Sequence, residues 1–227
     1  MRANSIPNRV TNLKRIAYYG GTFDPVHCGH ITVAKWLLDL FSLDRFVFLP
    51  AFHAPHKPDR KPTSGYHRFA MLALATQDDP RISVSTLELL HGEKRYTVET
   101  LPEVIERHTN SEVFFVLGAD SWSEITTWRE WEKVLLMTNH IVVTRPGYDI
   151  TFDHVSDAVR DRIVDLRYGR PTLPEGGGPK IYVTDAVQID VSATEIREDI
   201  LEDERLDREA DVPQEVAKYI EKYELYK

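Results

Sequence analysis

Short hydrophobic runs separated by polar stretches recur along the chain. Six of them are rich in β-branched or aromatic residues, which is typical of buried strands. They span residues 14–19, 45–49, 82–87, 112–117, 140–144 and 180–184. Apolar residues at helical spacing follow the first two runs, at Val33, Leu37, Leu40 and Phe41 and at Phe69, Leu72 and Ala73. Strands and helices therefore alternate along the sequence.

This alternation predicts an α/β fold. Because crossovers between parallel strands are right-handed, the connecting helices cover both faces of one sheet. We therefore predict a Rossmann-like, doubly wound parallel sheet with helices on both faces. Such sheets bind ligands beyond the carboxyl ends of their strands, so the loops that follow the strands are where functional residues are expected.

The end of the chain has the pattern of an amphipathic helix over residues 213–225. Val216, Ile220 and Tyr223 lie at helical spacing behind Pro213, which suits a first helical turn. We expect this helix to dock on the rest of the protein. The predicted organisation is an N-terminal tail over residues 1–13 and a single domain over residues 14–227, with a C-terminal helical part at about 192–227.

The composition is that of an ordinary globular protein, with 42% hydrophobic and 28% charged residues among 227. No segment has the apolar length that spans a bilayer, and residues 1–12 lack the apolar core of a secretory signal. One cysteine cannot form an internal disulfide, which favours the cytoplasm. The net charge of −8 argues against a general nucleic-acid binder. We expect a cytoplasmic protein without membrane or nucleic-acid partners.

The loop after the first predicted strand has the features of an anion site. The strand runs into Gly20 and Gly21, where the backbone can approach a bulky ligand in conformations that a side chain would block. We predict that His30 opens the next helix, so that His27 and His30 lie at a helix N-terminus. The partial positive charge and the free N–H groups of that terminus favour an anion.

Two other interpretations of these histidines stay open. They could bind a metal ion with Cys28, His53 and His56, although a helix N-terminus repels a cation and the spacing lacks paired ligand sets. They could also simply cap and pack, which is the commoner role of one histidine. Two histidines flanking a glycine, beside a Gly-Gly turn, favour the anion site.

Two more segments place cations after predicted strands. Lys57 lies in a proline-stiffened loop, which reduces the conformational entropy lost when it binds a phosphate. Ser192 and Glu195 have capping-box spacing at a helix start, and the forked donors of Arg197 suit phosphate oxygens. A solvated lysine, and a plain cap with a surface arginine, are the alternatives.

Residues 20–30, Gly-Gly-Thr-Phe-Asp-Pro-Val-His-Cys-Gly-His, resemble the signature of the nucleotidyltransferase superfamily with the HxGH motif. The resemblance implies that His27 and His30 contact ATP phosphates and stabilise the charge that develops at the α-phosphate. It implies ATP contacts along the same loop, at Gly20, Gly21, Thr22 and Phe23.

Residues 191–197, Val-Ser-Ala-Thr-Glu-Ile-Arg, are similar to the closing Ile-Ser-x-Thr-x-x-Arg motif of that superfamily. The resemblance implies that Ser192, Thr194 and Arg197 hold the ATP phosphates. Ala193 stands where serine is frequent, which puts one hydroxyl contact in doubt. Lys57 follows a Pro-His pair, and this segment resembles the Pro-His-Lys or Pro-His-Arg of the bacterial nicotinate-mononucleotide adenylyltransferases. The resemblance strengthens the prediction that Lys57 binds a phosphate.

The segment 96–101, Tyr-Thr-Val-Glu-Thr-Leu, begins another predicted helix. Thr97 is placed to cap it and to expose N–H groups to a carboxylate, although capping alone is the alternative. The segment resembles a stretch of the nicotinate-mononucleotide adenylyltransferases whose backbone receives the pyridine carboxylate. The resemblance implies that Tyr96 and Thr97 bind an acidic substrate.

Three more substrate-binding residues are implied by this resemblance. Gly118 and Asp120 follow the fourth predicted strand, and Asp120 is expected to contact a ribose or help place the metal. Trp128 is the candidate to stack on the pyridine ring. Trp122 and Trp131 compete for this role, and for any one of the three a largely buried place in the core is the ordinary expectation.

The sequence thus predicts an enzyme of NAD biosynthesis. It would transfer the adenylyl group of ATP to nicotinate mononucleotide and release pyrophosphate, with Mg²⁺ bound to the ATP and no metal site built by the protein. A homo-oligomer is allowed. The expected catalytic residues are His27, His30, Lys57 and Arg197.

Overall fold

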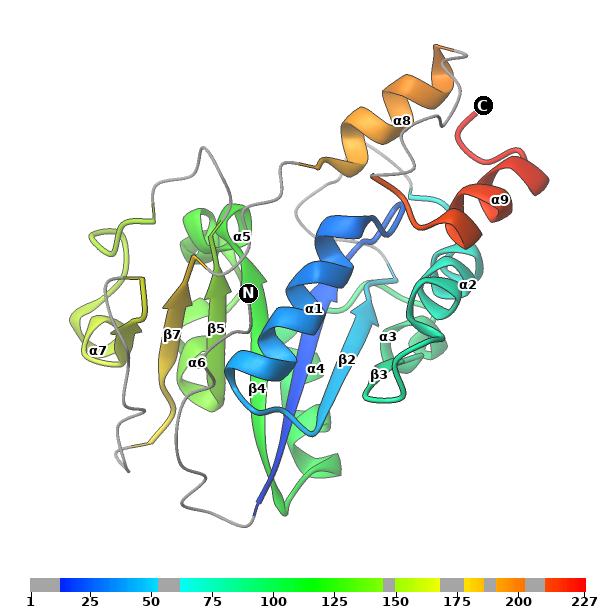
Figure 1. The fold of residues 1–227 in the computed structure, drawn as a ribbon. Coiled ribbons are helices and arrows are strands. Elements are labelled where there is room, and N and C mark those ends of the chain that lie inside the picture. The colour runs from blue at the N-terminus through cyan, green and yellow to red at the C-terminus, as the bar shows by residue number, and fades with distance from the viewer. Residues whose placement is uncertain (1–12, 53–61, 145–149, 168–177, 186–190, 203–210) are drawn as a thin grey trace.

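The computed structural model describes residues 13–52, 62–144, 150–167, 178–185, 191–202 and 211–227. At its centre lies a parallel sheet with the strand order β3-β2-β1-β4-β5-β7-β6 (Figure 1). The strands are β1 (Lys14–Gly21), β2 (Arg45–Pro50), β3 (Ile82–Val84), β4 (Ser111–Gly118), β5 (Asn139–Val143), β6 (Ile163–Asp165) and β7 (Ile181–Thr184). The prediction of a Rossmann-like parallel sheet is confirmed.

Helices connect the strands and extend beyond the last one. They are α1 (Cys28–Leu40), α2 (Gly65–Thr76), α3 (Leu87–His91), α4 (Thr97–Arg107), α5 (Ala119–Ser123), the 3₁₀ helix η1 (Ile125–Thr127), α6 (Trp131–Met137), α7 (Asp157–Arg160), α8 (Ala193–Leu201) and α9 (Gln214–Lys222). The last helix is shorter than its predicted span of 213–225.

Two hydrophobic cores lie on the two faces of the sheet, because successive side chains of a strand point to opposite sides. Ala17 and Phe46 face one core, which is completed by α1, α2, α8 and α9. Ile16 and Val47 face the other core, which is completed by α3, α4, α5, α6 and α7. The sheet is therefore doubly wound, as predicted.

The direction of winding reverses between β1 and β4. From β1 the chain continues outward through β2 and β3, and it then returns to add β4 on the other side of β1, with Tyr19 opposite Val116. A crevice forms beyond the carboxyl ends of the strands at such a reversal. In this protein it lies where β1 ends at Gly21 and β4 ends at Gly118.

Two sequence predictions differ from the structure. The strand predicted over 82–87 ends at Val84, because Ser85 accepts a hydrogen bond from the N–H of Leu87 (3.2 Å) and the chain turns into α3. The edge strand β6 was not predicted, since three residues are too few to show an alternating pattern. Residues 1–12 of the predicted tail lie outside the described residues.

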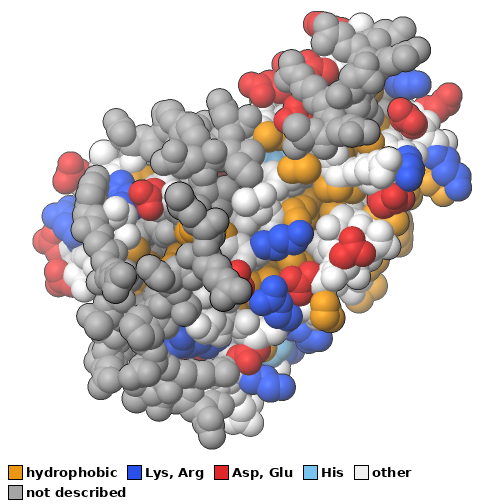
Figure 2. All heavy atoms as spheres, in the orientation of Figure 1, with side chains coloured by type: hydrophobic (Ala, Val, Ile, Leu, Met, Phe, Trp, Pro, Cys, Tyr) orange, Lys and Arg blue, Asp and Glu red, His pale blue; other side chains and the backbone are white. Residues whose placement is uncertain are grey.

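Charged side chains of both signs are interspersed over the face shown in Figure 2. Among the described residues on that face, the acidic side chains do not gather into one patch. Across the residues that the structure describes, each helix is too short or too polar to span a bilayer.

Candidate active site

A cavity of about 360 Å³ lies beyond the carboxyl ends of β1 and β4. Every predicted site residue that the structure describes lines it: Gly20, Gly21, Thr22, Phe23, His27, His30, Tyr96, Thr97, Gly118, Asp120, Trp128, Ser192, Thr194 and Arg197. Lys57, His53 and His56 lie outside the described residues. Segments separated by almost the whole sequence thus meet at one pocket, although the role of each residue stays a prediction.

The two histidines form a stacked pair at the start of α1. The helix begins at Cys28 with His27 as its N-cap, so the prediction that His30 opens it was wrong by two residues. The ring centroids of His27 and His30 are 3.6 Å apart. The backbone N–H of His27 donates to Nδ1 of His30 (3.2 Å), so a neutral His30 ring has its proton on Nε2.

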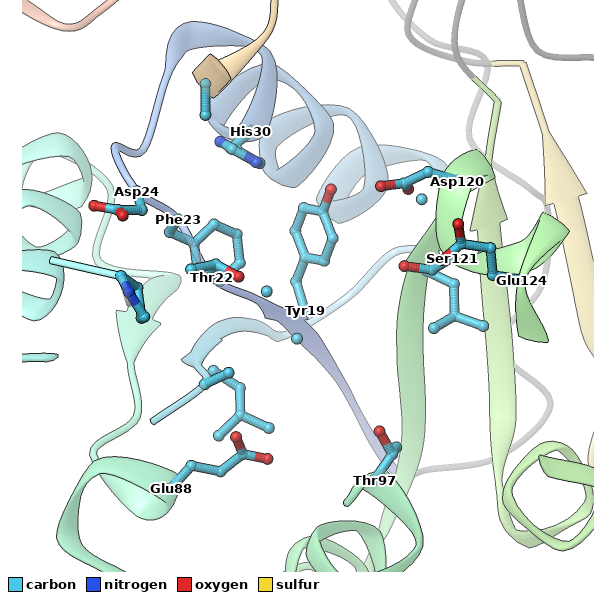
Figure 3. A pocket seen from close by; sticks show the side chains of 18 of the residues that line it. Tyr19, Thr22, Phe23, Asp24, His30, Glu88, Thr97, Asp120, Ser121 and Glu124 are labelled. Atoms are coloured by element: carbon cyan, nitrogen blue, oxygen red, sulfur yellow. The ribbon is translucent and has the colours of Figure 1, made fainter. Parts of the chain in front are cut away.

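Two aromatic rings pack against His30 of this histidine pair. Phe23 is buried and contacts the His30 ring edge to face, with centroids 5.0 Å apart, and Tyr19 contacts the same ring at 6.0 Å. Phe23 is therefore mainly a packing residue, although it lines the pocket. Figure 3 shows Phe23 and Tyr19 beside His30.

The structure corrects the reason given for the two glycines. Neither has a positive φ. A Cβ on Gly20 would lie 2.8 Å from Cζ of Phe115, and one on Gly21 would lie 2.8 Å from Cζ of Phe23. Glycine is required at both positions because aromatic rings occupy the space, rather than because the backbone takes an unusual conformation.

Helix α8 brings a second N-terminus and a guanidinium to the pocket. Ser192 caps the helix by accepting from the N–H of Thr194 (3.2 Å), which confirms the predicted cap. Arg197 donates through Nη1 to the carbonyl oxygen of Asp24 (2.6 Å) and through Nη2 to Oγ1 of Thr194 (3.1 Å). Arg197 therefore connects α8 to residues 20–30, the segment that carries both histidines and is called the histidine loop below.

A third helix N-terminus, that of α4, faces the opposite end of the pocket, where Thr97 lies far from His30 in Figure 3. Thr97 is the first residue of the helix rather than its cap, which corrects the prediction. Tyr96 is the N-cap, and its N–H donates to the Glu99 carboxylate (2.9 Å). The start of α4 nonetheless lines the pocket, as an anion site requires.

The structure separates the three competing tryptophans. Trp122 is fully buried, and its indole N–H donates to the carbonyl oxygen of Thr151 (3.0 Å), so it is a core residue. Trp131 packs against the same core. Trp128 alone of the three lines the pocket. It remains the stacking candidate.

The comparisons with known proteins agree with this geometry. Residues 18–199 match the family model described as cytidylyltransferase-like. A probable nicotinate-nucleotide adenylyltransferase of Desulfitobacterium hafniense is 35% identical over 94% of this chain and 96% of its own. One of Citrifermentans bemidjiense is 38% identical over 81% of this chain and 85% of its own. The chain belongs to the nicotinate-nucleotide adenylyltransferase family.

The fold has a solved counterpart in a more distant protein. The Plasmodium falciparum nicotinic acid mononucleotide adenylyltransferase, whose structure is complexed with NaAD, superposes with a TM-score of 0.71 at 23% sequence identity. The match covers 94% of this chain and 97% of the other. At this identity the similarity concerns the fold alone.

Several residues that line the pocket of this family member were not predicted from its sequence. Arg129 follows Trp128 directly; its guanidinium lies over the Tyr96 ring at 5.2 Å and donates to Oε1 of Glu99 (3.0 Å). Arg95 also lines the pocket. It donates to the carbonyl oxygen of Glu99 and to the Glu103 carboxylate. Adjacency to Tyr96 and Trp128 was the signal available in the sequence.

Glu88 is a carboxyl group that lines the pocket near α4. It accepts from the hydroxyl of Thr100 (2.8 Å), and burial raises its pKa above the ordinary value. Figure 3 shows Glu88 and Thr97 at the same end of the pocket. Glu88 is therefore a carboxyl group at the same end of the pocket as the start of α4, and burial disfavours its ionised form.

The other interpretation of His27 and His30 was that they bind a metal ion, and the described residues add no further ligands to such a site. Among them, no three His, Cys, Asp or Glu side chains are grouped as a metal site. Nδ1 of His30 accepts a backbone N–H, and burial raises the pKa of the Cys28 thiol above its ordinary value. Both features disfavour metal ligation by the histidine loop.

Proposed function

We propose that the chain transfers the adenylyl group of ATP to nicotinate mononucleotide, giving nicotinate adenine dinucleotide and pyrophosphate in NAD biosynthesis. One observation carries the proposal: a single pocket joins the paired histidines of the HxGH loop to the N-terminus of α4 and Trp128. The first group suits a triphosphate, and the second suits an aromatic ring that bears a carboxylate.

At the triphosphate end, the N-termini of α1 and α8 and the guanidinium of Arg197 surround the space above the Gly20-Gly21 strand end. Helix N-termini supply N–H donors and partial positive charge. The site can therefore bind a polyanion although the chain has a net charge of −8.

In the proposed reaction a phosphate oxygen of the mononucleotide attacks the α-phosphorus of ATP. A new P–O bond forms there as the bond from the α-phosphorus to the bridging oxygen breaks, and pyrophosphate leaves with that electron pair. The attacking phosphate is already ionised, so the protein supplies position and charge stabilisation. With its proton on Nε2, His30 can donate to an oxygen on which charge develops.

At the other end, the N-terminus of α4 and the Arg129 guanidinium favour a carboxylate over a neutral amide. Trp128 offers a flat face for the pyridine ring. These residues argue against pantetheine phosphate or an alcohol phosphate as the second substrate, because neither has an aromatic ring with a carboxylate.

Mg²⁺ is expected to enter with ATP. It prefers phosphate oxygens, water and one or two carboxylates, and Asp120, which lines the pocket, fits that donor set. A side chain on Gly118 would come within 2.6 Å of Asp120 Oδ1, so this glycine leaves room for the carboxylate. When bound, the ion would neutralise part of the triphosphate charge.

The proposal is tested by measuring pyrophosphate release from Mg-ATP with nicotinate mononucleotide and, separately, with nicotinamide mononucleotide. We expect turnover with the acid and a much lower kcat/KM with the amide. A nucleotide-binding regulator that has lost catalysis would bind ATP and release no pyrophosphate. A preference for the amide would refute the assignment of the α4 terminus.

A further inference from the structure

Asp24 lies in the histidine loop, but its carboxylate points away from Tyr19 at the centre of the pocket (Figure 3). The residue is only 5% exposed. Oδ2 accepts from the backbone N–H of Thr63 (3.1 Å), and Oδ1 accepts from the hydroxyl of Tyr226 (2.7 Å). Both carboxylate oxygens are thus used within the protein, which is the pattern of a structural rather than a ligand-binding carboxylate.

Tyr226 reaches Asp24 from the last residues of the chain, 202 positions away in the sequence. The turn after α9 directs it there: the N–H of Leu225 donates to the carbonyl oxygen of Ile220 (3.1 Å), and Tyr226 has a φ of 69°. A positive φ is unfavourable for a tyrosine and persists only where surrounding contacts stabilise it. Burial and the Asp24 charge raise the pKa of Tyr226, so its hydroxyl remains a donor.

Other distant segments hold the same loop on its remaining sides. Arg68, fully buried in α2, donates to the carbonyl oxygen of Thr22 (2.8 Å). The N–H of Cys28 donates to the carbonyl oxygen of Asp211 (2.8 Å). The loop between β1 and α1 is thus fixed at its start, middle and end, and the C-terminal part of the chain supplies three of the contacts, through Arg197, Asp211 and Tyr226.

We propose that Tyr226 is a positioning residue that acts through Asp24: it fixes the loop that bears His27 and His30 against the pocket. This inference rests on the proposed function. Histidines that stabilise a transition state must be held in place, since a displacement of about 1 Å can lower turnover by about a hundredfold. Loss of the Tyr226 hydroxyl removes one hydrogen bond to a buried carboxylate and loosens the loop.

The test is a double-mutant cycle of Tyr226→Phe with His30→Ala, with pyrophosphate release as the readout. Alone, Tyr226→Phe should lower kcat about tenfold and leave the KM for nicotinate mononucleotide within about twofold. In the His30→Ala background, the same change should cost less than about twofold, because residues that act as a unit are not additive. A merely structural role would give the same loss in both backgrounds.

Tyr223→Phe is the matched control, because this tyrosine belongs to the same tail but packs its ring on Tyr219 and His67. It should leave kcat unchanged. If Tyr226→Phe does not stay folded at the assay temperature, Asp24→Asn replaces it in the cycle.

Equal losses in both backgrounds, or wild-type kcat in Tyr226→Phe, would overturn the positioning role alone. A wild-type protein that releases no pyrophosphate with either mononucleotide would refute the proposed function instead.

Discussion

The two ends of the pocket are built in different ways. At the triphosphate end, the histidine loop is held by residues from distant parts of the chain, with Arg197 and Tyr226 both bonded to Asp24. At the pyridine end, the contacts join residues that are closer in sequence, and they are more exposed. Arg129 pairs with Glu99, and their side chains are 54% and 41% exposed.

This difference matches what each end must do. Stabilising a transition state requires donors in fixed positions, and buried contacts between distant segments give such rigidity. Recognition of a ring and its carboxylate can be supplied by one helix start and the side chains next to it. Changes at the triphosphate end should therefore lower turnover, whereas changes at the pyridine end should alter substrate affinity and choice.

The largest effect is expected from His30→Ala. Removing a donor to the developing charge should lower kcat by about a hundredfold or more, which corresponds to about 3 kcal/mol of barrier. Steady-state pyrophosphate release measures it, with a thermal melt to show that the fold is intact. His91→Ala is the matched control, because His91 pairs with Glu103 on the surface. A folded His30→Ala enzyme with normal turnover would contradict the assignment of this end.

A buried histidine away from the pocket should change stability and not turnover. His140 in β5 is 0% exposed, and burial lowers its pKa to about 4 from 6.5. The unfolded chain therefore takes up a proton below pH 6.5 that the folded protein resists down to about pH 4. Stability should fall as the pH drops through this window, by up to about 3 kcal/mol from this group.

Urea unfolding at pH 7 and pH 4.5 tests this effect. In His140→Asn, the amide nitrogen replaces Nδ1 as the donor to the carbonyl oxygen of Thr138, a bond of 2.9 Å in the wild type. The variant should show a smaller loss of stability between the two pH values than the wild type. An identical loss would show that His140 does not titrate in this way.

At the pyridine end, Trp128→Ala should raise the KM for nicotinate mononucleotide about tenfold with little change in kcat. Stacking on an aromatic side chain contributes about 1–3 kcal/mol per base, and a pyridine ring is expected to behave similarly. Trp131→Ala, which changes a partly buried tryptophan that packs against the core and does not line the pocket, serves as the comparison. A fall in kcat with unchanged KM would mean that the two ends do not divide their roles as described.

The smallest effect is expected from Arg129→Gln. This exposed guanidinium is screened by solvent, so the preference for the acid over the amide should fall only about threefold. The ratio of kcat/KM for the two mononucleotides measures it. Lys94→Gln is the control, because Lys94 also lies over the Tyr96 ring, at 5.4 Å. If both variants changed the ratio equally, the effect would come from the loss of a positive charge and not from the position of Arg129.

The residues of the triphosphate end could be recognised in the sequence because their motif is local and dense, although their roles stay predictions. Two glycines, two histidines and a helix start lie within residues 20–30, and Gly20, Gly21, His27 and His30 all line the pocket. The contacts that hold this loop were not predictable. Nothing in the local pattern around Asp24 points to Tyr226, because the two meet only through the folding of the whole domain.

Elsewhere, hydrogen bonds between residues close in sequence changed where a strand ended or a helix began, and the hydrophobic pattern did not predict these ends. Leu87 continues an apolar run, but the Ser85 hydroxyl ends the strand and starts α3. Thr97 has the chemistry of a cap, yet the Glu99 side chain bonds to the N–H of Tyr96 and places the helix start one residue earlier. Roles that depend on ligands, including the choice between ribose and metal for Asp120, stay predictions.

The central claim is that one pocket joins ATP to a mononucleotide bearing a pyridine carboxylate. The most direct test is a competition assay in which wild-type protein and Mg-ATP are incubated with equal concentrations of nicotinate and nicotinamide mononucleotide. The dinucleotide products are then separated and quantified by mass spectrometry. The structure predicts that nicotinate adenine dinucleotide dominates by at least about tenfold, the preference expected from one to two charge-assisted hydrogen bonds. Equal amounts of the two products, an excess of the amide product, or no dinucleotide at all would contradict it.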